Sequence, residues 1–224
     1  MSRMFKTITR TWNPFTGCLF SCSYCWARKL VEERLQSQVK KYRDGFIPTF
    51  HPGELSRRFK PGDFVFVSDM GDIAFAGLEQ RRAIVERVSE FPETRFLFQS
   101  KDPGIFEGPT FGNLPNVYLG TTLETNRDYS LTRALSPLNR YLVMQRLDHT
   151  RKFISIEPII DFDLDVLVDW MRQIKPDIVE IGADNYHNHL PEPPWEKVEV
   201  LLEALREFVP RVIEKDRLHR LERR

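Results

Sequence analysis

The amino-acid sequence predicts an α/β protein, an open, partial (βα)6 TIM-like barrel with parallel strands. Short runs of β-branched and aromatic residues recur along the chain, and amphipathic helical patterns lie between them. Such alternation predicts a parallel sheet with right-handed crossovers. A closed eight-stranded barrel needs about 250 residues, and the chain has 224. A doubly wound sheet is the alternative architecture; in both, function belongs to the loops after the strands' C-terminal ends.

Six segments have the composition of strands. Residues 6–11 alternate polar and apolar side chains, whereas residues 64–68 (FVFVS) are almost wholly apolar, as expected of a strand covered on both faces. The other four predicted strands are residues 95–100, 117–122, 152–156 and 177–181.

Helical spacing of apolar residues appears between these segments. The predicted helices are residues 27–41, 78–90, 126–135 together with the segment to 147, 164–173 and 195–208. Residues 103–115 are rich in Gly and Pro, so we expect little helix there.

Composition excludes several classes of protein. With 41% hydrophobic residues the chain can bury a substantial core, and 33 Lys plus Arg against 32 Asp plus Glu give no global field that recruits nucleic acid or membrane. The first residues have no apolar signal-peptide core, and no apolar run approaches the roughly 18 residues of a membrane span. We therefore expect one cytoplasmic domain over residues 1–224, without a membrane partner.

The three cysteines carry the most information. Cys18, Cys22 and Cys25 follow the first predicted strand with the spacing C-x3-C-x2-C, in a loop of residues 12–26 that also holds turn formers. Cytosolic thiols stay reduced, so metal ligation is favoured over disulfides. Closely spaced cysteines hold iron–sulfur clusters, and three thiolates on a four-iron cluster leave one iron open. The alternatives are a zinc site completed by His51, His187 or His189, and three unligated thiols.

This pattern resembles the signature of the radical S-adenosylmethionine (SAM) superfamily, in which an aromatic residue precedes the last cysteine, here Tyr24. Four further segments resemble a phage-associated, three-Cys-motif branch that is radical-SAM-like. They are Thr11-Trp-Asn-Pro with Gly17, Gly120-Thr-Thr-Leu-Glu124, Ser155-Ile-Glu157-Pro158 and Ile181-Gly182-Ala-Asp184-Asn185.

The resemblance implies an enzyme with a 4Fe-4S cluster on Cys18, Cys22 and Cys25 and with SAM bound through its amino and carboxylate groups. Reductive cleavage of SAM would give methionine and a 5′-deoxyadenosyl radical that acts on a substrate. The cofactor supplies the difficult chemistry, and the protein supplies orientation and exclusion of water. An external electron donor is implied, either flavodoxin- or ferredoxin-like or a chemical reductant.

Polar residues at the predicted strand ends are the candidates for cofactor binding. The superfamily often has Gly-Gly-Glu after its second strand; here Ser68-Asp69-Met70-Gly71-Asp72 follows, so Asp69 or Asp72 would accept the ammonium group of SAM. The remaining candidates are Tyr24, Thr122, Glu124, Ser155, Glu157 and Gly182. Because buried carboxylates need partners, the competing interpretation of Glu124 and Glu157 is an ion pair with Lys101 or Arg151.

The sequence is compatible with two classes of substrate, because a nucleic acid and a small heterocycle both suit an open barrel. Clusters of Lys and Arg in residues 28–60 and 211–224 are interspersed with acidic residues, so a solvated helical surface is favoured over a phosphate-binding rim. The functional alternative is a non-catalytic zinc- or iron–sulfur-binding interaction module.

Overall fold

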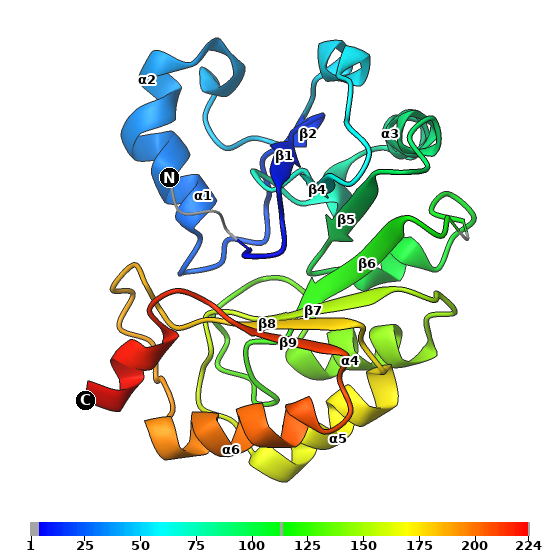
Figure 1. Cartoon of the computed structure of the whole chain (residues 1–224). Helices are drawn as coiled ribbons and strands as arrows, with labels where there is room; N and C mark the ends of the chain where they lie inside the picture. The colour runs from blue at the N-terminus through cyan, green and yellow to red at the C-terminus, as the bar shows by residue number, and fades with distance from the viewer. Residues whose placement is uncertain (1–4, 113, 224) are drawn as a thin grey trace.

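The computed structural model describes residues 5–112 and 114–223, in which seven parallel strands form a curled half-barrel (Figure 1). The predicted α/β partial barrel is confirmed, with seven strands in place of six. In order across the sheet the strands are β1 (Arg10–Trp12), β4 (Phe64–Val67), β5 (Arg95–Gln99), β6 (Val117–Thr122), β7 (Lys152–Ile156), β8 (Ile178–Ile181) and β9 (Arg211–Glu214). All neighbouring pairs are parallel, so every C-terminal end lies at one edge of the sheet.

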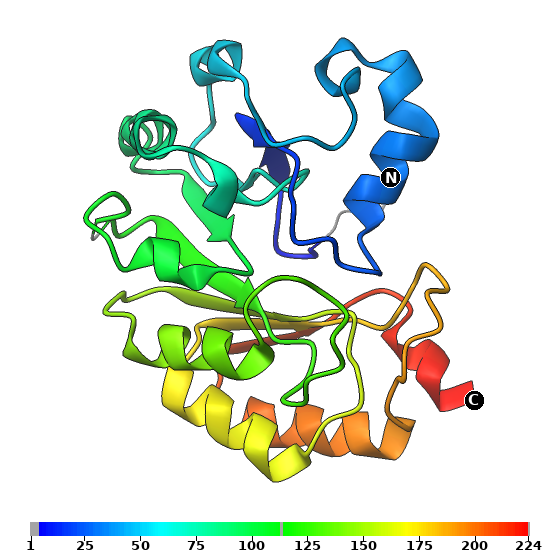
Figure 2. The same ribbon diagram turned by 180° about the vertical axis from the view of Figure 1, so that it is seen from behind.

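Four helices pack on the outer face of this sheet: α3 (Leu78–Ser89), α4 (Pro137–Arg146), α5 (Leu164–Ile174) and α6 (Trp195–Arg206). Helix α1 (Trp26–Leu30), which is followed by α2 (Gln36–Gln38), belongs to a separate apolar cluster with Tyr42, Phe46 and Met70. Seen from behind, α4, α5 and α6 lie side by side against the second half of the sheet (Figure 2). A π-helical turn, Val31–Leu35, separates α1 from α2, and a small antiparallel pair joins β2 (Phe15–Thr16) to β3 (Thr49–Phe50).

Alternation along the strands divides the apolar side chains into two layers. On β4, Val65 and Val67 belong to the large core between sheet and helices, whereas Phe64 and Phe66 point into the barrel. The inner layer is continued by Leu97, Tyr118, Phe153, Ile178 and the partly buried Ile213. Phe5 packs into this inner layer, with its ring centroid 5.0 Å from that of Phe153 and 5.3 Å from that of Phe66.

The first strand begins later than predicted, because the segment before it serves another purpose. The buried carboxylate of Glu180 on β8 accepts hydrogen bonds from the backbone N–H groups of Lys6 and Thr7, both at 3.0 Å, and from the Thr7 hydroxyl. Residues 6–7 therefore bridge toward the far half of the sheet, and strand pairing starts only where the Thr9 N–H reaches Phe64 O. The predicted strand 6–11 is corrected to β1.

Two predicted helices also differ from the structure. No helix forms over residues 126–135, because Arg127 pairs with Asp161 and Asp163 and thereby holds the chain in a loop. Helix α4 starts at Pro137, where the Ser136 hydroxyl caps the N-terminus by accepting from Asn139 N–H at 3.3 Å. The predicted helix over 27–41 is divided into α1, the π-helical turn and α2.

Strand β9 was not predicted, since its four residues begin with an exposed arginine and end with a glutamate. It pairs with β8 and carries the chain back to the C-terminal edge of the sheet. Among the described residues, no helix combines the length and the apolar character that crossing a membrane requires.

Candidate functional site

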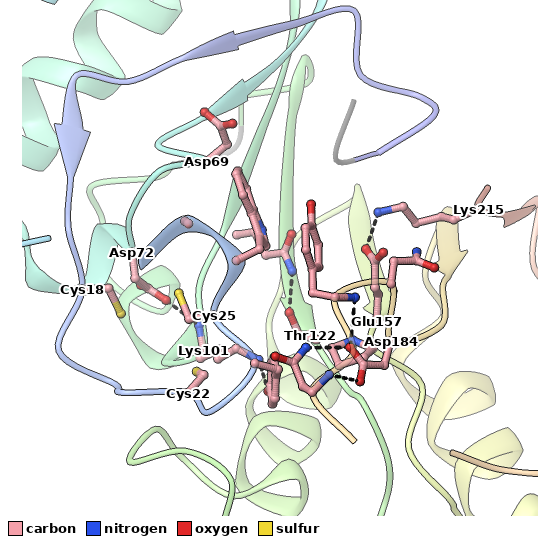
Figure 3. Close-up of a pocket in the computed structure, with 18 of the residues that line it drawn as sticks. Cys18, Cys22, Cys25, Asp69, Asp72, Lys101, Thr122, Glu157, Asp184 and Lys215 are labelled. Atoms are coloured by element: carbon pink, nitrogen blue, oxygen red, sulfur yellow. Dashed lines mark hydrogen bonds and ion pairs between the residues drawn. The ribbon is translucent and has the colours of Figure 1, made fainter. Parts of the chain in front are cut away.

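A cavity of about 590 Å³ opens at the C-terminal ends of the strands (Figure 3). The three cysteines of the loop between β1 and α1 line it, and the figure shows them on the opposite side from Glu157 and Lys215. Its volume lies within the range of about 300–1,000 Å³ typical of small-molecule sites.

The cysteine loop, residues 12–26, is held in shape by close contacts with Ile47 and Arg28. Gly17 has φ +83°, and a Cβ there would lie 2.1 Å from the Ile47 carbonyl oxygen, so only glycine fits. The loop ends where the Cys25 sulfur accepts from Arg28 N–H at 3.4 Å and so caps helix α1. Arg28 in turn donates to the Cys18 carbonyl oxygen at 2.9 Å, which connects the two ends of the cysteine motif.

All three thiols are free and partly buried. Burial, assisted by the nearby Asp72 carboxylate, raises the pKa of Cys18 to about 12, and burial also raises the pKa of Cys25. Metal-free, Cys18 and Cys25 therefore hold their protons at neutral pH, and a bound metal would release them.

No group of three or more His, Cys, Asp or Glu side chains in the described part of the chain is arranged to hold one metal ion. His51 hydrogen-bonds the Thr16 hydroxyl at 2.8 Å. His187 and His189 are exposed in the loop after β8, and neither lines the cavity. The geometry thus supplies no preassembled fourth ligand for the zinc alternative.

A buried ionic network fastens the cysteine loop to the sheet. The Tyr24 hydroxyl donates to Glu124 Oε1, and Lys101 Nζ donates to the same carboxylate and to Tyr24 Oη, the latter at 3.0 Å. The other oxygen, Glu124 Oε2, lies 2.9 Å from Arg140 Nη1 of α4. Both cations offset the burial of Glu124 and hold the pKa of its carboxyl down at about 2. Glu124 is therefore engaged on both oxygens and does not line the cavity.

Asp72 lies in the cavity wall beside the cysteines (Figure 3). Its carboxylate accepts from Ser100 Oγ at 2.6 Å, Lys101 N–H at 2.9 Å and Ala74 N–H at 3.0 Å. A carboxylate has about four acceptor positions, so one remains for a ligand. Its charge contributes to the raised pKa of Cys18, which places the carboxylate close to that thiol.

Asp69 lines another part of the cavity, away from the cysteines in Figure 3. Its Oδ1 accepts from Asn13 Nδ2 at 2.6 Å. Burial raises the pKa of this carboxyl to about 6, although the Asn13 hydrogen bond and the charge of Lys41 oppose the shift.

Of the remaining predicted site residues, two line the cavity and two lie behind its wall. Thr122 and Glu157 line the cavity, and Glu157 pairs with Lys215 of the segment after β9. Gly182 does not line it, but makes room: a Cβ there would lie 2.7 Å from Glu157 Oε1. Ser155 is fully buried and is not part of the wall.

The loop after β8 is organised around Asp184. Its carboxylate accepts from Asn188 N–H and Nδ2, both at 2.6 Å, and from Tyr186 N–H at 3.3 Å. The Asp184 N–H donates to Glu192 at 2.7 Å, and Arg220 donates to the Asp184 carbonyl oxygen at 2.7 Å and to Glu192. This hub fixes Asn185, Tyr186 and Asn188 at the cavity.

Residues 4–191 match the family described as "Protein of unknown function (DUF5131)". The chain belongs to this family. A search of curated proteins found no match.

Among solved structures, the DUF5131 chain is similar to a spore photoproduct lyase mutant with bound AdoMet and dinucleoside spore photoproduct. The TM-score is 0.61 at 10% identity, over 91% of this chain and 75% of that one. It is also similar to Streptococcus suis SuiB bound to precursor peptide SuiA, with a TM-score of 0.59 and 11% identity, over 98% of this chain and 52% of that one. At such identities these likenesses show a shared fold.

Sequence reasoning overlooked several residues that the DUF5131 fold brings to the cavity. Lys101 was considered only as an ion-pair partner, and Lys215 only as part of a basic tail. Gln99 is the last residue of β5 and the last but one of the predicted strand 95–100, a position at which an inward polar side chain could have been noticed. Lys215 had no such signal, because its strand was not predicted.

We expect Glu124→Gln to lower the free energy of unfolding at pH 7 by about 3–5 kcal/mol, because it leaves the buried Arg140 without its counter-ion. The carboxyl pKa is lowered on folding, so this stabilisation is complete above the unfolded value near 4.5 and is lost as pH falls toward about 2. Urea denaturation at pH 7 and at lower pH checks it. Glu107→Gln, which removes an exposed partner of Arg146, is the control and should cost little; equal losses would contradict the network's importance.

Asp69 provides the opposite pH dependence. Its folded pKa of about 6 lies above the ordinary value of 3.8 for an Asp carboxyl, so ionised Asp69 destabilises the fold above pH 6 and this cost disappears below about pH 4. Asp69→Asn should therefore stabilise the protein at pH 8 by up to about 3 kcal/mol and have little effect at pH 4. Thermal or urea unfolding across this range measures it, with the exposed Asp148→Asn as control. A gain in the free energy of unfolding that does not change with pH would contradict the raised pKa of Asp69.

Proposed function

We propose that this protein is a radical SAM enzyme, with a 4Fe-4S cluster held by Cys18, Cys22 and Cys25. The observation that carries the proposal is the position of these cysteines: all three line one cavity at the C-terminal edge of a parallel half-barrel. In barrels of parallel strands this edge is where active sites are found.

The donor set suits such a cluster. Iron–sulfur clusters are bound by thiolates, and three of them leave one iron free to bind another molecule. The three thiols are free, and the cavity continues beyond them as far as Glu157 and Lys215. When bound there with SAM, a reduced cluster would supply the electron for reductive cleavage to methionine and a 5′-deoxyadenosyl radical.

The structural neighbours support this proposal at the level of the fold. Spore photoproduct lyase was solved with AdoMet bound, and the half-barrel of this chain covers three quarters of it. The sequence motif C-x3-C-x2-C adds an argument that does not depend on the fold. The resemblance of the four shorter segments extends the proposal to the phage-associated three-Cys-motif branch.

The proposal gives the polar residues around the cavity distinct roles in binding SAM and in positioning the cysteine loop. Asp72, beside Cys18, accepts a hydrogen bond from the ammonium group of SAM with its remaining acceptor position. Tyr24 and Glu124 hold the cysteine loop in register with the sheet. Asp69 and Ser155 are further from the cysteines or behind the wall, so their contribution is to the shape and charge of the cavity.

The proposal includes an external electron donor, either a flavodoxin- or ferredoxin-like protein or a chemical reductant, because the described residues contain no second cysteine cluster. It places the enzyme in the cytoplasm, where thiols stay reduced. It treats residues 1–224 as one catalytic domain in which residues 12–26 form the cluster loop.

Replacing any one of Cys18, Cys22 and Cys25 by Ala should abolish stable cluster binding, since each supplies a thiolate that the chain cannot replace. Iron and sulfide analysis after anaerobic reconstitution measures this, with visible absorbance near 400 nm as a second readout. Circular dichroism of the metal-free variants separates cluster loss from misfolding. Full occupancy in any single variant would remove that cysteine from the ligand set, and a colourless zinc protein would favour the non-catalytic alternative.

Reduced, cluster-loaded protein should bind SAM and release 5′-deoxyadenosine slowly without substrate. Asp72→Asn should weaken SAM binding about tenfold or more, because a hydrogen bond between charged groups contributes about 1.5–3 kcal/mol. Calorimetry gives the affinity and chromatography the product, with Asp148→Asn as an exposed control. An intact cluster with neither binding nor cleavage would refute the proposed function.

A further inference from the structure

The inward-facing side chains of the half-barrel change character along the strands. Positions two apart on a strand point to the same face. The inner apolar layer holds Leu97, Tyr118, Phe153, Ile178 and Ile213. Two residues further toward the C-terminal ends, the same face carries Gln99, Gly120, Ser155, Glu180 and Lys215. An aromatic and aliphatic interior therefore gives way to polar and small residues directly below the cavity.

Two residues of this layer, Gln99 and Lys215, reach the cavity, together with Thr122 and Glu157, which lie two residues beyond Gly120 and Ser155 on the same face. These four residues line the cavity and form its floor, hereafter the polar floor. In Figure 3 Glu157 and Lys215 lie across the cavity from the cysteines. The structure makes room for this floor, because Gly182 leaves space for the Glu157 carboxylate that any other residue would occupy.

The charges of the polar floor compensate each other. Lys215 pairs with Glu157, and next to them Lys6 pairs with Asp216 at 3.0 Å. A charged ligand group placed against the largely buried Glu157–Lys215 pair would leave one charge without a partner, which is costly where little water remains. The floor therefore favours a neutral group that offers both hydrogen-bond donors and acceptors.

Gln99 further limits the kind of ligand group that the polar floor can bind. Its Nε2 donates to Thr122 Oγ1 at 2.7 Å, whereas its Oε1 is buried and has no hydrogen-bond partner in the described part of the chain. A carboxamide pairs best with an edge that carries a donor beside an acceptor, as nucleobases do. At the rim, the Tyr186 ring is 53% exposed and lines the same cavity, so it offers a surface on which a flat ring can stack.

We propose that the polar floor binds the substrate and that the group bound there is a nucleobase, carried by a free nucleoside or by a nucleic-acid strand. This inference rests on the proposed function, since it assumes that SAM occupies the cysteine side of the cavity. It assigns Thr122 and Glu157 to the substrate, whereas the sequence alone had grouped both with residues of the cofactor.

The test measures binding directly. Saturation-transfer difference NMR and calorimetry are run on the full chain, metal-free and cluster-loaded with SAM, using uridine, thymidine, cytidine, adenosine, guanosine and ribose. At least one nucleoside should bind and ribose should not. Short single-stranded DNA and RNA oligonucleotides distinguish the sources: tighter binding than the nucleoside indicates a nucleic-acid strand, and equal or absent binding indicates a free nucleoside.

Substitutions in the polar floor test whether the nucleoside binds there. Gln99→Leu, which is similar in size, and Glu157→Gln should each raise the dissociation constant about tenfold or more. Lys197→Met is the matched control, because it breaks an ion pair with Asp161 outside the cavity and should leave binding unchanged. If Glu157→Gln does not fold, Gln99→Leu alone decides.

Three results would overturn the inference: no nucleoside or oligonucleotide binds, binding survives both floor variants, or SAM competes with the nucleoside for the same place. Intact SAM cleavage alongside any of them would leave the proposed function standing. Failure to load a cluster would instead refute the proposed function, while the metal-free measurement would still decide whether the floor binds a nucleobase.

Discussion

The geometry of the cavity depends on one buried carboxylate, that of Glu124. It receives the Tyr24 hydroxyl from the cysteine loop, Lys101 from the end of β5 and Arg140 from α4, so four separate parts of the chain meet at two oxygen atoms. Removing a carboxylate, a hydroxyl group and two cations from water is costly, and their mutual pairing offsets this cost. Tyr24 stands between Cys22 and Cys25, so the position of two thiols relative to the sheet follows from this network.

The parallel sheet was predictable from the sequence because its signal is local. Segments such as FVFVS and RFLFQS identify buried strands whatever surrounds them, and five of the six predicted strands lie where the structure has them, with ends differing by a residue. The segment 6–11 was misplaced because Lys6 and Thr7 bond to Glu180, more than 170 residues away. Strand β9 was missed for a related reason: its short, partly exposed sequence becomes a strand only because the edge of β8 is available.

The candidate site shows the same division. The cysteines, Asp72 and Thr122 could be named because a motif or a strand end marked them, and the structure brings them to one cavity. The ion-pair partners of a buried carboxylate could not be predicted from its position in the sequence. Glu124 and Glu157 both follow strands, yet Glu124 pairs with two cations whereas Glu157 pairs with one lysine and lines the cavity. Which carboxylate is available depends on Arg140 and Lys215, whose places are set by helix packing and by an unpredicted strand.

These two carboxylates give the cavity its asymmetry. On the cysteine side, Glu124 is saturated and serves to hold the loop, which leaves Asp72 as the acidic group with an acceptor position beside Cys18. On the other side, Glu157 has one cationic partner and a glycine in place of a neighbouring side chain, so its second oxygen keeps space around it. The cavity therefore has a preorganised anchor on the cysteine side and an accessible ion pair, Glu157 with Lys215, on the other side. This arrangement suits a reaction in which one bound molecule is held fixed while a second is recognised. Preorganisation of this kind lowers the entropy cost of bringing two reactants together, and here it follows from which buried charge has two partners and which has one.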